Sequence, residues 1–299
     1  MILDYSKVEY AEFDLSTRCN AKCPLCYRNY KAFKDHYPNN IERDLSELKA
    51  QIAEFPNLKW IYLVGSISEP TIYSHFLELV QYIKNRGILI ELCTNGSTRN
   101  PKFWKELGRL LTTEDKVYFT ICGSTQELHE TYRKGTNLAK ILENARALRS
   151  VTACDYAQCI RFSYNNADFE SAAFKELIGE FTHIYMTETF IQQPREMYRN
   201  DFDWDTFKPA HSKFDDIQKL ANSLKVGSFK CDCESIEYKK IQVDVYGNVY
   251  PCYLFLEASH GELWNGNYSN ILNGKYECCR FCTRAIKRYL IKHDLVNIV

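Results

Sequence analysis

Three cysteines lie within eight residues near the start of the chain. Cys19, Cys23 and Cys26 belong to the segment STRCNAKCPLCYRNY at 16–30. Thiolates this close together can ligate three irons of a [4Fe–4S] cube and leave the fourth iron without a protein ligand. A structural zinc site would need a fourth ligand, for which the nearest candidate is His36, ten residues further on. The spacing therefore favours an open iron–sulfur site.

This C-x3-C-x2-C spacing resembles the signature of the radical S-adenosylmethionine (radical SAM) enzymes. In that family the open iron chelates the methionyl group of SAM, and the reduced cluster splits SAM to a 5′-deoxyadenosyl radical. The resemblance implies a [4Fe–4S] cluster with an open iron, bound SAM, and a flavodoxin- or ferredoxin-type reductant. It also places Leu25, between the last two cysteines, beside the cofactor.

The cysteines must be positioned by the elements around them. Runs rich in β-branched and aromatic residues predict strands near 9–15, 59–64, 88–93, 116–121, 158–164 and 182–187. Helical patterns fill the gaps near 44–54, 72–86, 101–111, 125–149, with a break at Gly135, and 168–180. Six strand–helix alternations predict an α/β fold with a parallel sheet. The family resemblance narrows this to a partial (β/α)6, TIM-like barrel, with its site at the carboxyl ends of the strands.

The segment LVGSISEPTIY follows the second predicted strand. Its residues Gly65, Ser68, Glu69 and Pro70 resemble the Gly-Gly-Glu-Pro element with which radical SAM proteins hold the ammonium of SAM, although the paired glycines are replaced. The resemblance implies that these four residues bind the cofactor. Alternatively, Glu69-Pro70 is a helix-entry turn with an acid in its first turn.

The third and fourth predicted strands end in further polar residues. Thr94 and Asn95, followed by a glycine, resemble a family segment close to the methionyl group of SAM, or form only a turn. Thr120 falls where the auxiliary-cluster subgroup has a serine that contacts SAM. Cys122 replaces the aspartate of that segment and is a candidate functional thiol, or a packing residue.

On the fifth predicted strand Arg161, Ser163 and Asn165 alternate with apolar residues. Period-two alternation places these three on one face, and helices outside the sheet would keep the apolar side outward. We therefore expect the three polar side chains in the lumen, where they would contact SAM. On an edge strand the same pattern would mean only exposure to solvent.

Six cysteines return in the last seventy residues. The C-x13-G-x4-C run with a later C-x2-C resembles the twitch domain, the shortened form of the SPASM domain, which binds an auxiliary [4Fe–4S] cluster. The predicted ligands are Cys233, Cys252, Cys279 and Cys282, with Cys231 and Cys278 as alternates. A structural zinc ribbon on the same thiolates is the alternative. Tyr253 stands where sulfatase-maturing relatives have a base, so it is a candidate catalytic residue but that reaction is not carried over.

These features predict three regions: a barrel at 1–187, a bridge at 188–230 with a helix near 213–225, and a twitch/SPASM-like domain at 231–299. The last region contains a predicted hairpin turn at Gly247 and a final helix at 280–293.

Charge and cysteine content exclude several classes of partner. Among the 299 residues, lysine plus arginine equals aspartate plus glutamate at 38 each, so no net charge recruits nucleic acid or an acidic membrane. No apolar run approaches the length of a membrane span. Thirteen cysteines without a secretion signal predict metal or redox chemistry in a reducing cytoplasm.

We therefore predict a radical SAM oxidoreductase or maturase. Its predicted substrate is a ribosomally made peptide, modified by crosslinking, epimerisation or oxidation. The alternative substrate is a small polyol- or aminocyclitol-type intermediate of natural-product biosynthesis. A non-catalytic iron–sulfur sensor or scaffold is the remaining alternative, supported by the altered Gly-Gly-Glu-Pro segment.

Overall fold

The computed structural model describes residues 5–29, 40–188, 203–207 and 240–250. The predictions for most of the bridge, for the helices near 213–225 and 280–293, and for residue 36 fall outside these ranges. So do the predicted tail residues Cys231, Cys233, Cys252, Tyr253, Cys278, Cys279 and Cys282. In the described ranges no helix combines the length and apolar character needed to cross a membrane.

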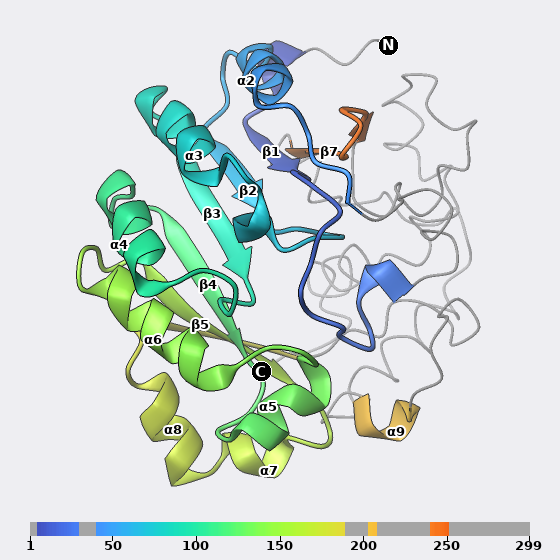
Figure 1. The fold of residues 1–299 in the computed structure, drawn as a ribbon, viewed down its shortest axis with the longest axis vertical. Coiled ribbons are helices and arrows are strands. Elements are labelled where there is room, and N and C mark those ends of the chain that lie inside the picture. Colours follow the sequence, from blue (N-terminus) through green and yellow to red (C-terminus); the bar gives the residue numbers. More distant parts are fainter. Residues whose placement is uncertain (1–4, 30–39, 189–202, 208–239, 251–299) are drawn as a thin grey trace, which may run out of the picture.

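The described strands form one open, twisted sheet in the order β6-β5-β4-β3-β2-β1-β7-β8 (Figure 1). All neighbours are parallel except the last pair, β7 and β8. Their bounds are β1 Tyr10–Phe13, β2 Trp60–Leu63, β3 Leu89–Thr94, β4 Lys116–Ile121, β5 Asp155–Arg161, β6 His183–Glu188, β7 Lys240–Val243 and β8 Val249–Tyr250. The open, parallel arrangement confirms the predicted partial barrel.

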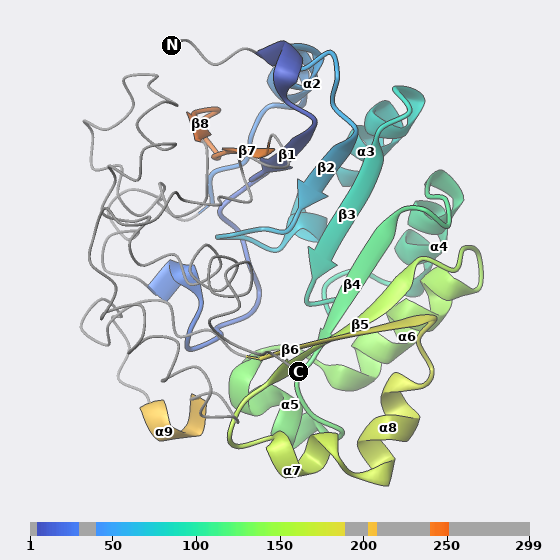
Figure 2. The same ribbon diagram turned by 180° about the vertical axis from the view of Figure 1, so that it is seen from behind.

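Helices connect the parallel strands and lie along one face of the sheet (Figures 1 and 2). The α-helices are α2 Leu45–Ala53, α3 Phe76–Asn85, α4 Pro101–Leu110, α5 Gln126–Tyr132, α6 Leu138–Arg149, α7 Asn166–Phe169, α8 Ala172–Ile178 and α9 Trp204–Phe207. Short 3-10 helices occupy η1 Tyr5–Lys7, η2 Tyr27–Asn29 and η3 Pro70–Ile72. Side-chain caps fix several starts: Asn100 accepts from the N–H of Phe103 ahead of Pro101, and Asn137 caps α6.

The core lies between the helices and the sheet. Strand β3 alternates between buried and half-buried residues, with Ile90 and Leu92 turned to the helices. Trp104 of α4 is fully buried and its ring lies 4.8 Å from that of Phe119 on β4. Full burial of an apolar side chain of this size stabilises the fold by about 1.5–3 kcal/mol. The predicted break at Gly135 is confirmed, because this residue has φ +81° between α5 and α6.

The fifth strand begins three residues earlier than predicted, and this changes the face on which its side chains lie. Strand β5 ends at Arg161, so Ser163 and Asn165 follow it in a turn. Arg161 lies over the ring of Phe169, a residue of the helix-covered core, at 5.5 Å. The expectation that these three side chains share the lumen face is therefore wrong. The prediction failed because the alternation of polar and apolar residues continues past Arg161, where the strand has ended and the chain turns.

The predicted hairpin is confirmed at β7 and β8, which pair antiparallel around Gly247 with φ +84°. Strand β7 also adds in parallel to β1, with Glu12 beside Gln242. The hairpin thus extends the barrel sheet beyond β1. The boundaries of the three predicted regions stay a prediction.

Candidate active site

The cysteine loop leaves β1 at the carboxyl edge of the sheet, where the sites of parallel α/β folds lie. The N–H of Cys26 donates to the carbonyl of Cys23 at 3.2 Å, and Asn29 Nδ2 donates to the same carbonyl at 2.7 Å. One tight turn leading into η2 thus carries two of the three thiols.

The three thiols interact electrostatically. Burial, followed by the charges of Glu69, Cys26 and Cys23, raises the pKa of Cys19 to about 12. Burial and then Cys23 raise the pKa of Cys26 to about 11. Thiols with pKa values raised this far are protonated near neutral pH, so they would bind as thiolates only where a cation such as iron replaces their protons. The donor set therefore fits a three-thiolate cluster. Since no three His, Cys, Asp or Glu side chains in the described ranges already converge as metal ligands, ligation stays a prediction.

Loops after β2 and β3 hold the cysteine loop on one side. The N–H of Glu69 donates to the carbonyl of Arg18 at 2.9 Å, and Arg28 Nη1 donates to that of Ile67 at 2.9 Å. Asn95 Nδ2 donates to Asn20 Oδ1 at 2.8 Å. These contacts link the loop to two neighbouring strand ends.

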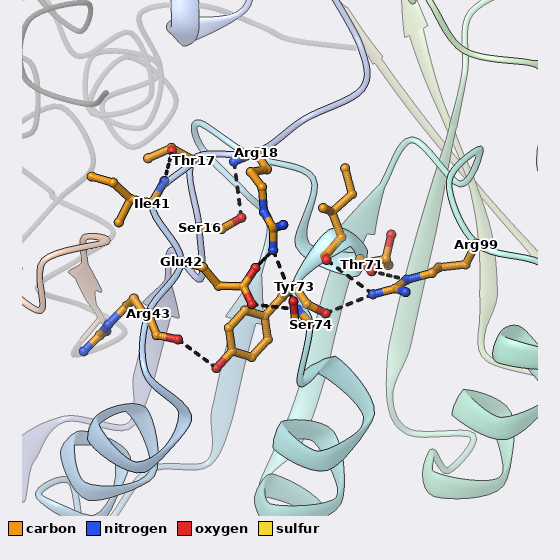
Figure 3. Close-up of polar contacts among 11 residues, drawn as sticks. Ser16, Thr17, Arg18, Ile41, Glu42, Arg43, Thr71, Tyr73, Ser74 and Arg99 are labelled. Carbon is orange, nitrogen blue, oxygen red and sulfur yellow. Dashed lines mark hydrogen bonds and ion pairs between the residues drawn. The ribbon is translucent and has the colours of Figure 1, made fainter. Parts of the chain in front are cut away.

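A further segment, 41–43, fastens the start of the loop (Figure 3). Ile41 and Thr17 exchange two hydrogen bonds, at 2.9 and 3.0 Å. Glu42 pairs with Arg18 and accepts from the N–H of Ser74 at 3.1 Å. Figure 3 shows Glu42 joining the cysteine loop to the residues after η3.

The connection between α5 and α6 contacts the cysteine loop on the side opposite the loops after β2 and β3. The N–H of Lys22 donates to the carbonyl of Lys134 at 2.8 Å, and Asn20 Nδ2 contacts that of Gly135 at 3.4 Å. Arg133 Nη1 lies 3.6 Å from Cys23 Sγ. Sequence reasoning missed Arg133 and Asn20, because nothing local in either segment announces their long-range contact.

Glu69 is buried, and its carboxylate accepts four hydrogen bonds from protein donors. Oε1 accepts from Thr71 N and Oγ1 and from Thr94 Oγ1, at 3.2, 2.6 and 2.6 Å. Oε2 accepts from the N–H of Asn95 at 2.7 Å. Glu69 is also the N-cap of η3, ahead of Pro70. These contacts favour the alternative interpretation from the sequence, a helix-entry turn, over a direct ligand for an ammonium group.

Gly65 and Ser68 shape the turn before Glu69. Gly65 has φ +61°, and a Cβ there would lie 2.3 Å from the carbonyl oxygen of Ser68 and 2.8 Å from Pro70. Only glycine fits this position. Ser68 Oγ is buried and has no hydrogen-bond partner among the described residues.

Thr94 and Asn95 form a turn with internal hydrogen bonds. Asn95 Oδ1 accepts from the N–H of Ser97 at 3.0 Å, and Thr94 Oγ1 accepts from that of Gly96 at 2.9 Å. Gly96 has φ +69°. The segment is thus a turn, which binds the cysteine loop through Asn95, and contact of Thr94 and Asn95 with SAM stays a prediction.

Thr120 and Cys122 lie at the end of β4. Thr120 Oγ1 contacts the carbonyl of Thr94 at 3.4 Å and Gln158 Oε1 at 3.2 Å. Cys122 is fully buried, and burial raises the pKa of its thiol to about 11. Its N–H donates to Nδ1 of His129 at 3.3 Å, and burial lowers the pKa of His129 to about 3. His129 is therefore neutral, with the hydrogen on Nε2.

The three predicted polar residues near the end of β5 make local contacts. Arg161 pairs with Glu170 at 3.0 Å. Ser163 Oγ donates to the carbonyl of Asp205 at 2.6 Å, which fastens α9. Asn165 is buried, and its Nδ2 donates to the carbonyls of Cys122 and Ile160, both at 3.0 Å.

Aromatic rings surround the buried end of the cysteine loop. The rings of Tyr132 and Phe162 lie 4.6 Å apart, and Tyr164 and Phe207 lie within 5.9 Å of Phe162. This aromatic cluster packs together with Cys23, Cys122, Leu25 and Cys26. The predicted contact residue Leu25 thus lies in the apolar wall beside the thiols, which would exclude water from a bound cluster.

Charged and aromatic side chains share the face of the sheet opposite the helices. The residues before and after Glu91 on β3 pack in the helix-covered core, so Glu91 faces the other way. Glu91 lies 3.8 Å from Lys116, which lies 5.1 Å from the ring centroid of Trp60. Lys240 of β7 lies 3.4 Å from Glu12. Trp60 and Lys116 are the first residues of β2 and β4, so this pair lies at the amino edge of the sheet, away from the cysteine loop.

A family model of the Radical SAM superfamily matches residues 14–154. This range contains the cysteine loop and strands β2, β3 and β4. A Radical SAM superfamily domain is therefore present in the chain.

Curated relatives are about a quarter identical to the chain over the aligned residues. The tungsten-containing aldehyde ferredoxin oxidoreductase cofactor-modifying protein of Pyrococcus furiosus is 24% identical over 84% of this chain and 72% of its own. The 7,8-dihydro-6-hydroxymethylpterin dimethyltransferase of Methanocaldococcus jannaschii is 26% identical over 83% of this chain. The chain spans 54% of the length of the second relative.

Solved structures share the fold. Streptococcus suis SuiB bound to S-adenosylmethionine matches with a TM-score of 0.59 and 12% identity, over 96% of this chain and 75% of its own. The protein anSMEcpe with bound AdoMet matches with a TM-score of 0.56 and 17% identity, over 82% and 71%. At these identities the likeness is one of fold.

Proposed function

We propose that this chain, in which residues 14–154 form a Radical SAM superfamily domain, is an enzyme that cleaves SAM reductively and removes hydrogen from a substrate carbon. The domain implies SAM and a [4Fe–4S] cluster, which we assign to Cys19, Cys23 and Cys26. When bound, they would supply a 5′-deoxyadenosyl radical. The observation that carries the proposal is the loop of three interacting thiols at the carboxyl edge of a parallel sheet.

The chain's own residues would orient the bound groups and exclude water. The aromatic cluster covers the buried side of the thiols, and Asn20 and Lys22 fix the loop to α5–α6. The unpartnered Ser68 Oγ and the tight turn at Gly65 are available to a polar cofactor, whereas Glu69 shapes that turn from behind. The proposed electron source is a flavodoxin- or ferredoxin-type reductant.

An auxiliary [4Fe–4S] cluster on Cys233, Cys252, Cys279 and Cys282 remains part of the proposal. Its support is the hairpin: β8 ends at Tyr250, two residues before Cys252, and β7 lies beside β1. Because β8 runs antiparallel to β7, with Tyr250 opposite Gln242, the chain leaves β8 toward the end at which β7 begins, so the segments that carry Cys233 and Cys252 join the hairpin at the same end. Such a cluster would accept the electron left after hydrogen removal, which would make the enzyme an oxidoreductase or maturase.

We propose a small heterocyclic molecule of the cofactor type as the leading substrate class. The names of the two curated relatives support it, since one modifies a cofactor and the other methylates a pterin. A ribosomally made peptide is the second candidate, because a solved neighbour, SuiB, was crystallised with its precursor peptide SuiA.

Deuterium transfer tests both the reaction and the substrate class. The reconstituted protein is incubated without oxygen with SAM, a reductant and either a deuterated pterin-type compound or a deuterated peptide. The proposal predicts deuterium in 5′-deoxyadenosine with the heterocycle. Deuterium transfer from the peptide alone would make a peptide the leading substrate class. If no 5′-deoxyadenosine formed with either compound, the protein would instead be a non-catalytic sensor or scaffold.

A further inference from the structure

Arg133 is half-buried and its guanidinium lies against the cysteine loop. It is the first residue after α5, and its Nη1 lies 3.6 Å from Cys23 Sγ. Its Nε is buried and has no hydrogen-bond partner among the described residues. Among the described residues the guanidinium makes a hydrogen bond to the sulfur of Cys23 and no ion pair with a carboxylate. The charge is therefore directed at sulfur.

The backbone around Arg133 is fixed to the same loop, so the side chain has a defined position. Lys22 donates to the carbonyl of Lys134 at 2.8 Å. Thr136 Oγ1 donates to the carbonyl of Arg133 at 2.7 Å and lies 2.9 Å from His129 Nε2. The guanidinium also lies 5.3 Å from the ring centroid of Tyr132. These contacts would therefore keep the guanidinium of Arg133 at a fixed position relative to the cysteine loop.

A cation at this place affects a cluster on the three thiols in one direction. Reduction of a [4Fe–4S] cluster takes one electron from the reductant and adds one negative charge, with no proton transferred. A positive charge close by, in a site shielded from water, stabilises the more negative state more strongly. Hydrogen bonds to the sulfurs act in the same direction.

We propose that Arg133 raises the reduction potential of the cluster bound by Cys19, Cys23 and Cys26, and so makes the cluster reducible by a flavodoxin- or ferredoxin-class donor. Arg133 is thus a positioning and tuning residue that acts through Cys23. The inference rests on the proposed function, because it requires a cluster on these thiols.

The test is a redox titration of the full chain, reconstituted without oxygen and followed by electron paramagnetic resonance in the absence of SAM. The signal to follow is the one missing from a variant with all three loop cysteines changed to alanine. The variants are Arg133→Gln, Arg133→Lys and the control Lys134→Gln. Lys134 is the next residue, and its side chain is exposed, so the control removes the same charge without removing the contact.

At the potential where the parent is half reduced, Arg133→Gln should lower the ratio of reduced to oxidised cluster about tenfold, equivalent to about 59 mV for one electron. Arg133→Lys and Lys134→Gln should stay within about twofold of the parent. A ratio in Arg133→Gln equal to that in Lys134→Gln would overturn the inference. Arg133→Gln could fail to bind a cluster. In that case, a cluster bound by Arg133→Lys would support the need for a positive charge at this position. A cluster lost from both variants would show that Arg133 acts by packing alone. A parent that binds no iron would instead refute the proposed function.

Discussion

The carboxylate of Glu69 accepts a 2.7 Å hydrogen bond from the backbone N–H of Asn95, and this contact joins the loop after β2 to the end of β3. Each partner also binds the cysteine loop, Glu69 through its N–H to Arg18 and Asn95 through its side chain to Asn20. The sequence element that resembles a cofactor-binding motif is therefore also the brace of the loop that carries the thiols.

Glu69→Ala should destabilise the fold strongly. The change leaves the N–H and hydroxyl donors of Thr71 and Thr94 and the N–H of Asn95 buried without their acceptor, at a cost of at least about 3 kcal/mol. Urea unfolding measures the loss. Glu78→Gln is the matched control, because Glu78 is exposed and pairs with Lys49 at the surface, so little change is expected. Equal stability of the two variants would show that Glu69 does not brace the site.

Gly65→Ala should damage the turn, whereas Gly87→Ala should cost far less. Both glycines have positive φ, but a Cβ at Gly65 lies 2.3 Å from a carbonyl oxygen while one at Gly87 meets nothing within 4 Å. The control should therefore lose only about 1–2 kcal/mol of folding stability from backbone strain. SAM binding measured by calorimetry should be lost in Gly65→Ala and kept in Gly87→Ala. Retained binding in both would place SAM away from this turn.

Asp14→Asn should stabilise the protein increasingly as the pH rises. Asp14 is 1% exposed, and burial, followed by the charges of Glu12 and Asp244, raises its pKa well above 3.8. The folded state then binds the proton more tightly than the unfolded state. The free energy that Asp14 takes from folding is absent below about pH 3.8, and it grows as the pH rises toward the pKa of Asp14 in the folded state. Unfolding of parent and variant between pH 4 and pH 8 measures the divergence.

Asp44→Asn provides the control of opposite sign. Its pKa is lowered by hydrogen bonds from Ser46 and Glu47 at the start of α2. Its contribution is present above the unfolded pKa and lost on acidification, so this variant should be less stable than the parent near pH 7 and approach it toward pH 3. If Asp14→Asn followed the same trend, Asp14 would be ionised in the folded state.

The order and type of the strands and most helices could be predicted from the sequence, because buried parallel strands form short apolar runs between amphipathic helices. The face of the sheet on which Arg161 lies could not be predicted, because the alternation of polar and apolar residues continues into the turn after β5. The addition of β7 beside β1 joins segments far apart in the sequence, and no local pattern specifies it.

The cysteine triplet of the site could be predicted from spacing, since three thiols in one loop need no knowledge of the fold. The residues that hold the cysteine loop in place could not be predicted from the sequence. Arg133 meets Cys23 across 110 positions of sequence, and Asn20 meets Asn95 across 75. Glu69 could be located from its motif, but which groups fill its carboxylate depends on the neighbouring strand end.

The central claim is that the thiols of Cys19, Cys23 and Cys26 hold a cluster that cleaves SAM, and the most direct measurement is the amount of 5′-deoxyadenosine formed without oxygen from SAM and dithionite. The parent should form it and bind about four iron atoms more than the variant with all three cysteines changed to alanine, which should form none. Cys154→Ala, which removes a buried thiol from the helix-covered core, should retain the product. An iron-loaded parent that forms no 5′-deoxyadenosine, or a triple variant that still forms it, would contradict the account.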